Sequence, residues 1–265
     1  MVTVAPHEGV LRFAVVGDGG DGTAAVARAI ARVHAAKPLD AIVLPGDNVY
    51  PCGVRSATDS RWAVLQPLMA LHLPLFPVLG NHDYCGNPDA EIGAPFPEWH
   101  FPAKEYLLQG GVADFAMIDT TPYVRGRAPA PDAGALLAAS HAPWRIVVGH
   151  HTIVSSGYHG YFPRGEHRRM LALLKGLRAA HVDLYICGHD HHLELVDGRP
   201  RMLISGASSD PVAPLALHAH TLFPDSTRTQ GGFAVVEVTR EAMVVTFYDL
   251  EGRRLGEFSL RHTYA

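Results

Sequence analysis

Short apolar runs alternate with amphipathic stretches along the first two thirds of this 265-residue chain. Five of the runs occupy residues 11–16, 41–45, 75–79, 146–148 and 182–187. Continuous apolar runs of this length are typical of strands buried on both faces of a parallel sheet. The stretches 23–37 and 168–181 carry apolar residues at helical spacing, and Pro38 ends the first of them. The alternation predicts parallel strands joined by helices.

Each of the five runs stops at a glycine, after which a side chain able to bind a metal follows. The pairs are Gly17-Asp18, Gly46-Asp47, Gly80-Asn81, Gly149-His150 and Gly188-His189, with His191 two residues beyond the last. Parallel strands joined by right-handed crossovers all run the same way, so the residues just beyond their carboxyl ends collect along one edge. A glycine there permits a sharp turn and close backbone approach. A single such pair is an ordinary turn, but five in succession predict convergence on one crevice.

The last third of the chain has a different pattern. Residues 232–239, 242–250 and 254–261 read as consecutive strands joined by short turns, which predicts an antiparallel meander. Combined with the parallel part, this favours an α/β fold of four layers, an αββα sandwich of two mixed β-sheets flanked by helices. We expect residues 1–265 to form a single domain.

Composition narrows the classes of partner. The net charge of -4 leaves no basic face for a phosphate backbone, which argues against nucleic acid. The apolar runs are all shorter than the roughly 18 residues that a membrane span needs, so no membrane association is expected. Residues 1–9 lack the basic and then apolar pattern of a secretion signal. Cytoplasmic residence is therefore the default expectation, and periplasmic or secreted residence is the alternative if a leader has been removed.

The chain has three cysteines and none of them has CxxC spacing, which argues against a structural zinc site. Cys187 lies in an apolar run and is expected to pack as a small apolar residue. Cys52 and Cys85 each follow a candidate ligand loop. A local disulfide between them stays open at this point, and two unpaired thiols are the expected state.

The ligand types indicate the metals. Imidazole, carboxylate and carboxamide groups bind first-row transition metals, and the absence of cysteine at the strand ends argues against thiolate zinc and iron–sulfur sites. The candidate ligands are Asp18, Asp47, Asn81, His150, His189 and His191. They are too many for one tetrahedral ion, but they suit two ions roughly 3.5–4 Å apart that share a carboxylate. Asp47 is the natural bridge.

These motifs, in this order, resemble those of the calcineurin-like metallophosphoesterases. The matching segments are Gly17-Asp18-Gly19-Gly20, Gly46-Asp47-Asn48-Val49-Tyr50, Gly80-Asn81-His82-Asp83, Val147-Val148-Gly149-His150 and Gly188-His189-Asp190-His191. Tyr50, three residues after Asp47, narrows the resemblance to the purple acid phosphatases, and the short chain is similar to their small tartrate-resistant type. The resemblance extends over nearly the whole sequence.

The resemblance implies a specific division of ligands. It places Asp18, Tyr50 and His191 on the first metal and Asn81, His150 and His189 on the second, with Asp47 and a hydroxide as bridges. A tyrosine hydroxyl ionises near neutral pH only beside a strong Lewis acid, which favours Fe(III) in the first position. The second ion stays open between Fe(II), Zn(II) and Mn(II). Before hydroxide binds, two carboxylates and one phenolate against five positive charges leave a surplus near +2, which attracts a phosphate dianion.

Two further histidines are candidate catalytic residues. His82 follows Asn81 and precedes Asp83, so it could protonate the leaving oxygen while a carboxylate orients it. His159, in Gly157-Tyr158-His159-Gly160, resembles a second active-site histidine of the family. For His151 and His192, an indirect role behind the ligands and a surface position remain equal alternatives.

We therefore expect a phosphomonoesterase, an acid phosphatase in which metal-bound hydroxide attacks a small phosphate ester. The alternatives are a phosphodiesterase or phosphoprotein phosphatase of the same superfamily, and a redox-active di-iron protein that hydrolyses nothing. Substrate choice should reside in the loops at residues 85–111, 155–165 and 208–231. The sequence leaves the oligomeric state and the physiological substrate open.

Overall fold

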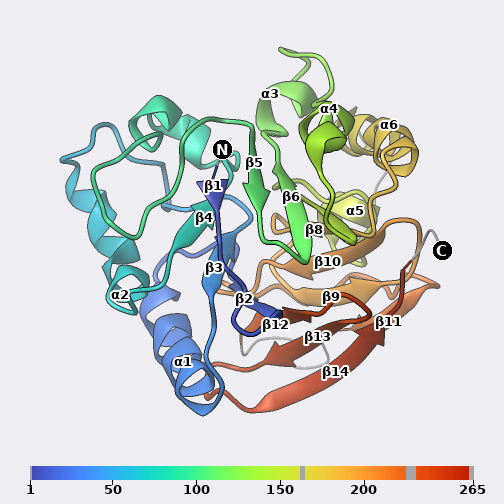
Figure 1. Ribbon diagram of the computed structural model, residues 1–265. Coiled ribbons are helices and arrows are strands. Elements are labelled where there is room, and N and C mark those ends of the chain that lie inside the picture. The colour runs from blue at the N-terminus through green and yellow to red at the C-terminus, as the bar shows by residue number, and fades with distance from the viewer. Residues whose placement is uncertain (1, 162–164, 225–230, 263–265) are drawn as a thin grey trace.

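Two mixed sheets lie face to face, and helices cover their outer sides, in the computed structural model of the chain (Figure 1). The structure describes residues 2–161, 165–224 and 231–262. The helices α1 and α2 lie beside the parallel half of one sheet, and α3, α4 and α6 cover the other. The expected four-layer αββα arrangement is confirmed.

The strands are β1 (Val2–Thr3), β2 (Leu11–Val15), β3 (Ala41–Leu44), β4 (Leu75–Pro77), β5 (Tyr106–Gln109), β6 (Ala113–Met117), β7 (Trp144–Val148), β8 (Leu184–Cys187), β9 (Leu193–Val196), β10 (Arg201–Ser205), β11 (Thr221–Pro224), β12 (Phe233–Val238), β13 (Met243–Tyr248) and β14 (Arg254–Leu260). The helices are α1 (Thr23–Ala36), α2 (Gln66–Met69), α3 (Thr121–Val124), α4 (Ala133–Leu136), α5 (Tyr158–Tyr161) and α6 (Gly165–Ala179). Short 3-10 turns span Ser60–Leu65, Asp83–Cys85, Pro88–Ala90 and Leu137–Ala139.

The larger sheet has the order β1-β5-β6-β7-β8-β10-β9-β11, with β6, β7, β8 and β10 parallel. The strand β8 is apolar and buried on both faces, because both faces of the sheet are covered there. In β8, Leu184 and Ile186 join the core between the sheets, whereas Tyr185 and Cys187 pack with the apolar residues of α6. The prediction that Cys187 packs as a small apolar residue is confirmed.

The smaller sheet has the order β14-β13-β12-β2-β3-β4. The strands β2, β3 and β4 are parallel, and β12, β13 and β14 form the expected antiparallel meander, which joins the rest of the sheet where β12 pairs with β2. The two sheets meet through large side chains. The rings of Phe13 on β2 and Phe115 on β6 pack edge to face with centroids 5.2 Å apart.

The five apolar runs divide between the two sheets, which corrects the expectation of a single sheet edge. The strands β2, β3 and β4 belong to the smaller sheet, and β7 and β8 belong to the larger one. Their carboxyl ends still meet, because Ser205 at the end of β10 joins the sheets. Its carbonyl accepts the Gly17 N–H at 2.9 Å, and its hydroxyl donates to the Val15 carbonyl at 2.8 Å.

The helix α6 begins three residues earlier than the apolar periodicity predicts. The reason is His167 in its first turn, which is buried although it is polar. Its Nε2 lies 2.9 Å from the carbonyl of Ile153. The earlier start brings Glu166 into the helix. No helix in the described ranges combines the length and apolar character needed to cross a bilayer.

Cys52 and Cys85 form a disulfide, so the expectation of two unpaired thiols was wrong. The strands β3 and β4 are neighbours, and the loops that follow them therefore run side by side. The carbonyl of His82 accepts N–H groups from both loops, from Gly53 at 2.9 Å and from Cys85 at 3.0 Å. These bonds bring the two cysteine Cα atoms to 5.0 Å, within the range that a disulfide needs.

Candidate metal centre

Glycines at the strand ends make room for aspartates of neighbouring loops. A Cβ added to Gly188, just before His189, would lie 2.2 Å from Oδ2 of Asp18. A Cβ added to Gly80 would lie 2.1 Å from Oδ1 of Asp47. Both distances are far below van der Waals contact. The recurrent glycines are thus required by the convergence of loops from different strands.

Three of the candidate ligands themselves adopt left-handed backbone conformations. The φ angles are 57° at Asp18, 52° at Asp47 and 67° at His189. Such conformations cost roughly 1 kcal/mol or more per non-glycine residue, and residues that retain them often cluster at functional sites. Hydrogen bonds hold two of these turns against each other, since the N–H of His189 donates to Oδ2 of Asp18 at 3.0 Å.

The first group of candidate ligands surrounds the hydroxyl of Tyr50. This oxygen lies 3.1 Å from Oδ1 of Asp18, 2.9 Å from Oδ2 of Asp47 and 3.2 Å from Nε2 of His191. The same His191 nitrogen is 3.5 Å from Asp18. One phenol proton cannot satisfy three acceptors at once, and a cation among them would satisfy all of them.

The second group surrounds Nε2 of His150. This nitrogen lies 3.0 Å from Oδ1 of Asn81, 3.1 Å from Nδ1 of His189 and 3.4 Å from Oδ2 of Asp47. Two imidazole nitrogens that face each other at 3.1 Å, beside an amide oxygen, form an uncharged ligand set suited to a divalent ion. The two groups together contain all seven candidate ligands.

Asp47 joins the two groups, because its Oδ2 contacts both Tyr50 and His150. Burial disfavours the charged form of Asp47, but the nearby His150 outweighs it and lowers the Asp47 pKa. Burial likewise opposes protonation of His150, yet Asp47 raises the His150 pKa to about 9. In the absence of a cation the carboxylate therefore holds a proton on the imidazole.

The second nitrogen of two ligand histidines is bonded to the backbone. Nδ1 of His150 lies 3.0 Å from the carbonyl of Pro45, and Nδ1 of His191 lies 3.2 Å from the carbonyl of Asp210. In the neutral rings, a proton donated to these carbonyls leaves the Nε2 lone pair directed at the ligand groups. This is the arrangement of metal-binding histidines.

Comparisons with known proteins agree with this geometry. The sequence pattern described as calcineurin-like phosphoesterase matches residues 11–193. The chain belongs to the calcineurin-like phosphoesterase family. Purple acid phosphatase 3 of Arabidopsis thaliana is 30% identical over 94% of this chain and 77% of its own length. Tartrate-resistant acid phosphatase type 5 of Rattus norvegicus is 30% identical over 94% of this chain and 90% of its own.

A solved structure, described as GAP50, the anchor in the inner membrane complex of Plasmodium, also superposes with a TM-score of 0.78. It is 27% identical and covers 97% of this chain and 90% of its own. The resemblance to the purple acid phosphatases is thus confirmed, and this chain is a metal-dependent phosphoesterase of the calcineurin-like family.

In this phosphoesterase, His82 lies beside the ligand groups but is oriented differently from the expectation. Its Nδ1 lies 2.7 Å from the carbonyl of Pro51, and its Nε2 lies 4.0 Å from Oδ2 of Asp47. The expected orienting carboxylate, Asp83, is instead buried and accepts the N–H groups of Asn48 at 2.9 Å and of Gly80 at 2.8 Å. Asp83 therefore holds the ligand loops, and a backbone carbonyl orients His82.

His159 also lies beside the ligands. Its ring packs against that of His189 with centroids 3.8 Å apart. Its N–H donates to Oδ1 of Asp190 at 3.0 Å, and the Asp190 carboxylate also accepts the Ser155 hydroxyl at 2.7 Å. Hydrogen bonds thus hold His159 and Ser155 against Asp190, which lies between the ligands His189 and His191.

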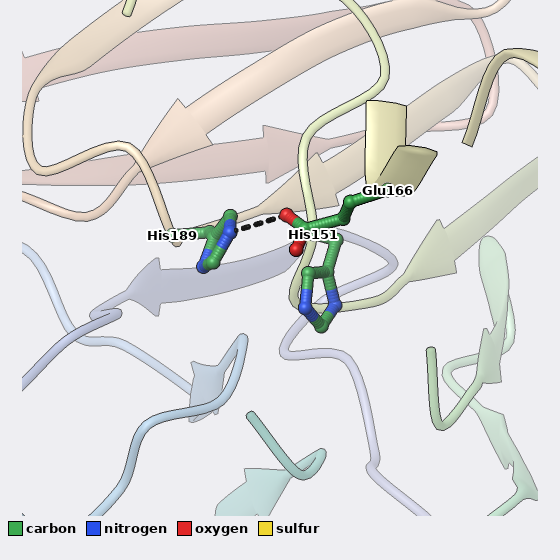
Figure 2. A group of neighbouring side chains, drawn as sticks. All are labelled: His151, Glu166 and His189. Carbon is green, nitrogen blue, oxygen red and sulfur yellow. Dashed lines mark hydrogen bonds and ion pairs between the residues drawn. The ribbon is translucent and has the colours of Figure 1, made fainter. Parts of the chain in front are cut away.

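The sequence interpretation missed Glu166, which lies beside two histidines of the site (Figure 2). Its Oε1 is 2.7 Å from Nε2 of His189, and ligand atoms of His151, Glu166 and His189 lie within 4.8 Å of one another. His151 is buried, with Nδ1 2.7 Å from the Thr120 hydroxyl. His192 is also buried, with Nε2 2.9 Å from Oε2 of Glu194, so neither histidine lies at the surface. No motif in the sequence could have indicated Glu166.

Proposed function

We propose that the protein hydrolyses small phosphate monoesters at a two-metal centre. Asp18, Tyr50 and His191 would hold Fe(III), and Asn81, His150 and His189 would hold a divalent ion, with Asp47 shared. The divalent ion is Fe(II), Zn(II) or Mn(II). When bound, the two ions would neutralise charge on the phosphate oxygens and activate water for the attack.

The position of the Asp47 carboxylate is the observation that carries this proposal. A single oxygen, Oδ2, lies within 3.4 Å of donor atoms from both ligand groups. The ligands come from both sheets, since Asp47 follows β3 of the smaller sheet and His150 follows β7 of the larger one. A bridging carboxylate between two ions explains why both sheets present ligands at one place, and it supports treating residues 1–265 as one functional domain.

Charge favours a monoester over a diester. Two carboxylates and a phenolate leave a surplus of about two positive charges on a trivalent–divalent pair. A phosphate monoester has a second pKa of about 6 and is largely dianionic at neutral pH, whereas a diester carries one negative charge. A positive site therefore attracts the dianionic monoester more strongly than the monoanionic diester.

His82 is proposed to supply the proton that the leaving oxygen needs. Because Nδ1 faces the Pro51 carbonyl, Nε2 is the nitrogen available to a substrate. The side chain is 37% exposed, so an ester bound to the ions can reach it from solvent. His159 has the same exposure and is proposed as a second contact for the substrate phosphate.

The test compares three substrates on the iron-loaded protein. Steady-state kcat/KM is measured with p-nitrophenyl phosphate, bis(p-nitrophenyl) phosphate and a phosphoserine peptide. We expect the simple monoester to be hydrolysed at least tenfold faster than the diester, and Asp47→Asn to abolish turnover. A diester rate above the monoester rate would assign the protein to the phosphodiesterases, and preference for the peptide would assign it to the phosphoprotein phosphatases.

A metal-loaded protein that turns over none of these esters would favour the redox-active alternative. That outcome is separable from poor loading, because iron content and the visible spectrum are measured on the same sample. Asp59→Asn is a suitable control, since Asp59 is an aspartate that pairs with Arg61 outside the ligand groups.

A further inference from the structure

Glu166 contacts a proposed ligand with its side chain from outside the two groups. Its Oε1 lies 2.7 Å from Nε2 of His189 (Figure 2). His189 is nearly buried, with 8% of its side chain exposed, whereas Glu166 is 38% exposed. The carboxylate thus approaches the ligand histidine from the solvent side, from the first turn of α6.

The contact decides which nitrogen of His189 can bind a metal. A neutral imidazole carries one proton, on Nδ1 or on Nε2. Nδ1 of His189 faces Nε2 of His150 at 3.1 Å, so it must be free of its proton to act as a ligand there. Glu166 accepts a hydrogen bond from the Nε2–H group and so favours the form of the ring that leaves the Nδ1 lone pair available.

In the other two ligand histidines, a backbone carbonyl contacts the nitrogen that does not face the ligand group. His150 uses Pro45 and His191 uses Asp210, and in both rings the metal-binding nitrogen is Nε2. His189 alone among the three has a charged acceptor on its second nitrogen. A carboxylate makes the ring a stronger electron donor to a metal than a carbonyl does.

We infer that Glu166 is a positioning residue of the proposed divalent-metal site, which fixes His189 with its Nδ1 lone pair directed at the ion. This inference rests on the proposed function. The carboxylate also lies 3.6 Å from Nδ1 of His159, whose ring packs on His189. Glu166 thereby sets the position of a metal ligand and of a proposed substrate contact together.

The first turn of α6 is held firmly enough for this role. His167, next to Glu166, is buried with Nε2 2.9 Å from the carbonyl of Ile153. Met170, one turn later, is fully buried against the larger sheet. The backbone of Glu166 is therefore fixed by its neighbours, although its own side chain is partly exposed.

A separate ion bound by His151, Glu166 and His189 fits the distances less well. Two ligands about 2.0–2.1 Å from a tetrahedral zinc ion lie roughly 3.3 Å apart. The contact between Glu166 and His189 is 2.7 Å, the length of a charge-assisted hydrogen bond. The same His189 ring would also have to lose both protons to bind ions on both sides.

The test measures metal affinity rather than catalysis. Glu166→Ala and Glu166→Gln are loaded with iron and zinc, and zinc is removed by competition with a chelator. We expect E166A to release the divalent ion about 10- to 100-fold more readily than the wild type, as loss of an outer partner of a ligand does. E166Q should lose less, since its amide oxygen still accepts a hydrogen bond from Nε2–H of His189. The visible iron band should remain in both.

Glu98→Ala is the matched control, because Glu98 makes a similar contact to His72, 3.1 Å away, outside the ligand groups. A zinc affinity of E166A equal to that of the wild type would overturn the inference. It would also be overturned if the wild type bound three ions per chain and both variants bound two. If E166A does not fold, the weakening must still be measurable in E166Q. If the wild type is inactive but the zinc affinities of the variants change as expected, the proposed function is wrong and the role of Glu166 still holds.

Discussion

The hydroxyl of Tyr50 donates a 2.9 Å hydrogen bond to Oδ2 of Asp47. Burial, and then the charges of Asp18 and Asp47, raise the Tyr50 pKa far above its ordinary value. Without a cation the phenol therefore stays protonated at every physiological pH. A phenolate at this position requires a strongly charged metal, so Tyr50 is the residue that tests the proposed Fe(III) site most directly.

Replacement of Tyr50 by phenylalanine should remove colour from the iron-loaded protein. The expected visible absorption arises from charge transfer between phenolate and Fe(III), and the variant has no phenolate. Absorption spectra of wild type and Tyr50→Phe, at matched iron content, provide the measurement. Tyr123→Phe is the control, because its hydroxyl bonds to the carbonyl of Arg169. An unchanged band in Tyr50→Phe would rule out Tyr50 as a ligand.

Loss of His82 should slow turnover without loss of metal. General acid catalysis contributes typically about 10²–10⁴-fold, so His82→Ala is expected to lower kcat by at least about 100-fold on an ester with a poor leaving group. The loss should be smaller with p-nitrophenyl phosphate, whose leaving group needs no proton. His72→Ala, at an exposed histidine, should have no effect. Equal losses on both esters would contradict the role of a proton donor.

The disulfide between Cys52 and Cys85 should stabilise the native state. It closes a loop of 33 residues in the unfolded chain, for which about 3–4 kcal/mol is expected. Denaturant unfolding of the metal-free protein, with and without reductant, measures the difference. The variant carrying both Cys52→Ser and Cys85→Ser should match the reduced wild type. Unfolding free energies that are independent of reductant would show that the bond contributes nothing.

Glu91 should make stability depend on pH. Burial raises its pKa to about 8, outweighing the hydrogen bonds from Asn48 and Asp83. Between the ordinary pKa of 4.5 and this value, the native state keeps a proton that the unfolded chain has released. The contribution of this group to the free energy of unfolding therefore falls as pH rises from 4.5 to 8.

Glu91→Gln removes this titration. Its stability relative to wild type should increase between pH 5 and pH 8 by at least about 1 kcal/mol, measured by denaturant unfolding of the metal-free proteins. Glu241→Gln, at an exposed turn, should show no such trend. A stability difference that is constant over this pH range would mean that Glu91 is ionised in the native state.

Apolar periodicity was enough to find the strands that carry ligands, because a strand buried on both faces is a continuous apolar run. It did not reveal how those strands are divided between two sheets. The start of α6 was predicted too late, since a buried polar residue, His167, interrupts the apolar pattern and gains its hydrogen bond from a distant carbonyl. The orienting partner of His82 was also assigned to the wrong group, because the adjacent Asp83 faces the loop backbone instead.

The sequence by itself determined the fold class, the candidate ligands and the family. Local order, an apolar run followed by a glycine and donor side chains, indicated six ligands, and the family resemblance added Tyr50. The tertiary structure decided the Cys52–Cys85 bond and the contact of Glu166 with His189, which join segments 33 and 23 residues apart. Neither pairing leaves a local pattern. Each exists only because neighbouring strands, or a helix packed on a sheet, bring separate loops within bonding distance.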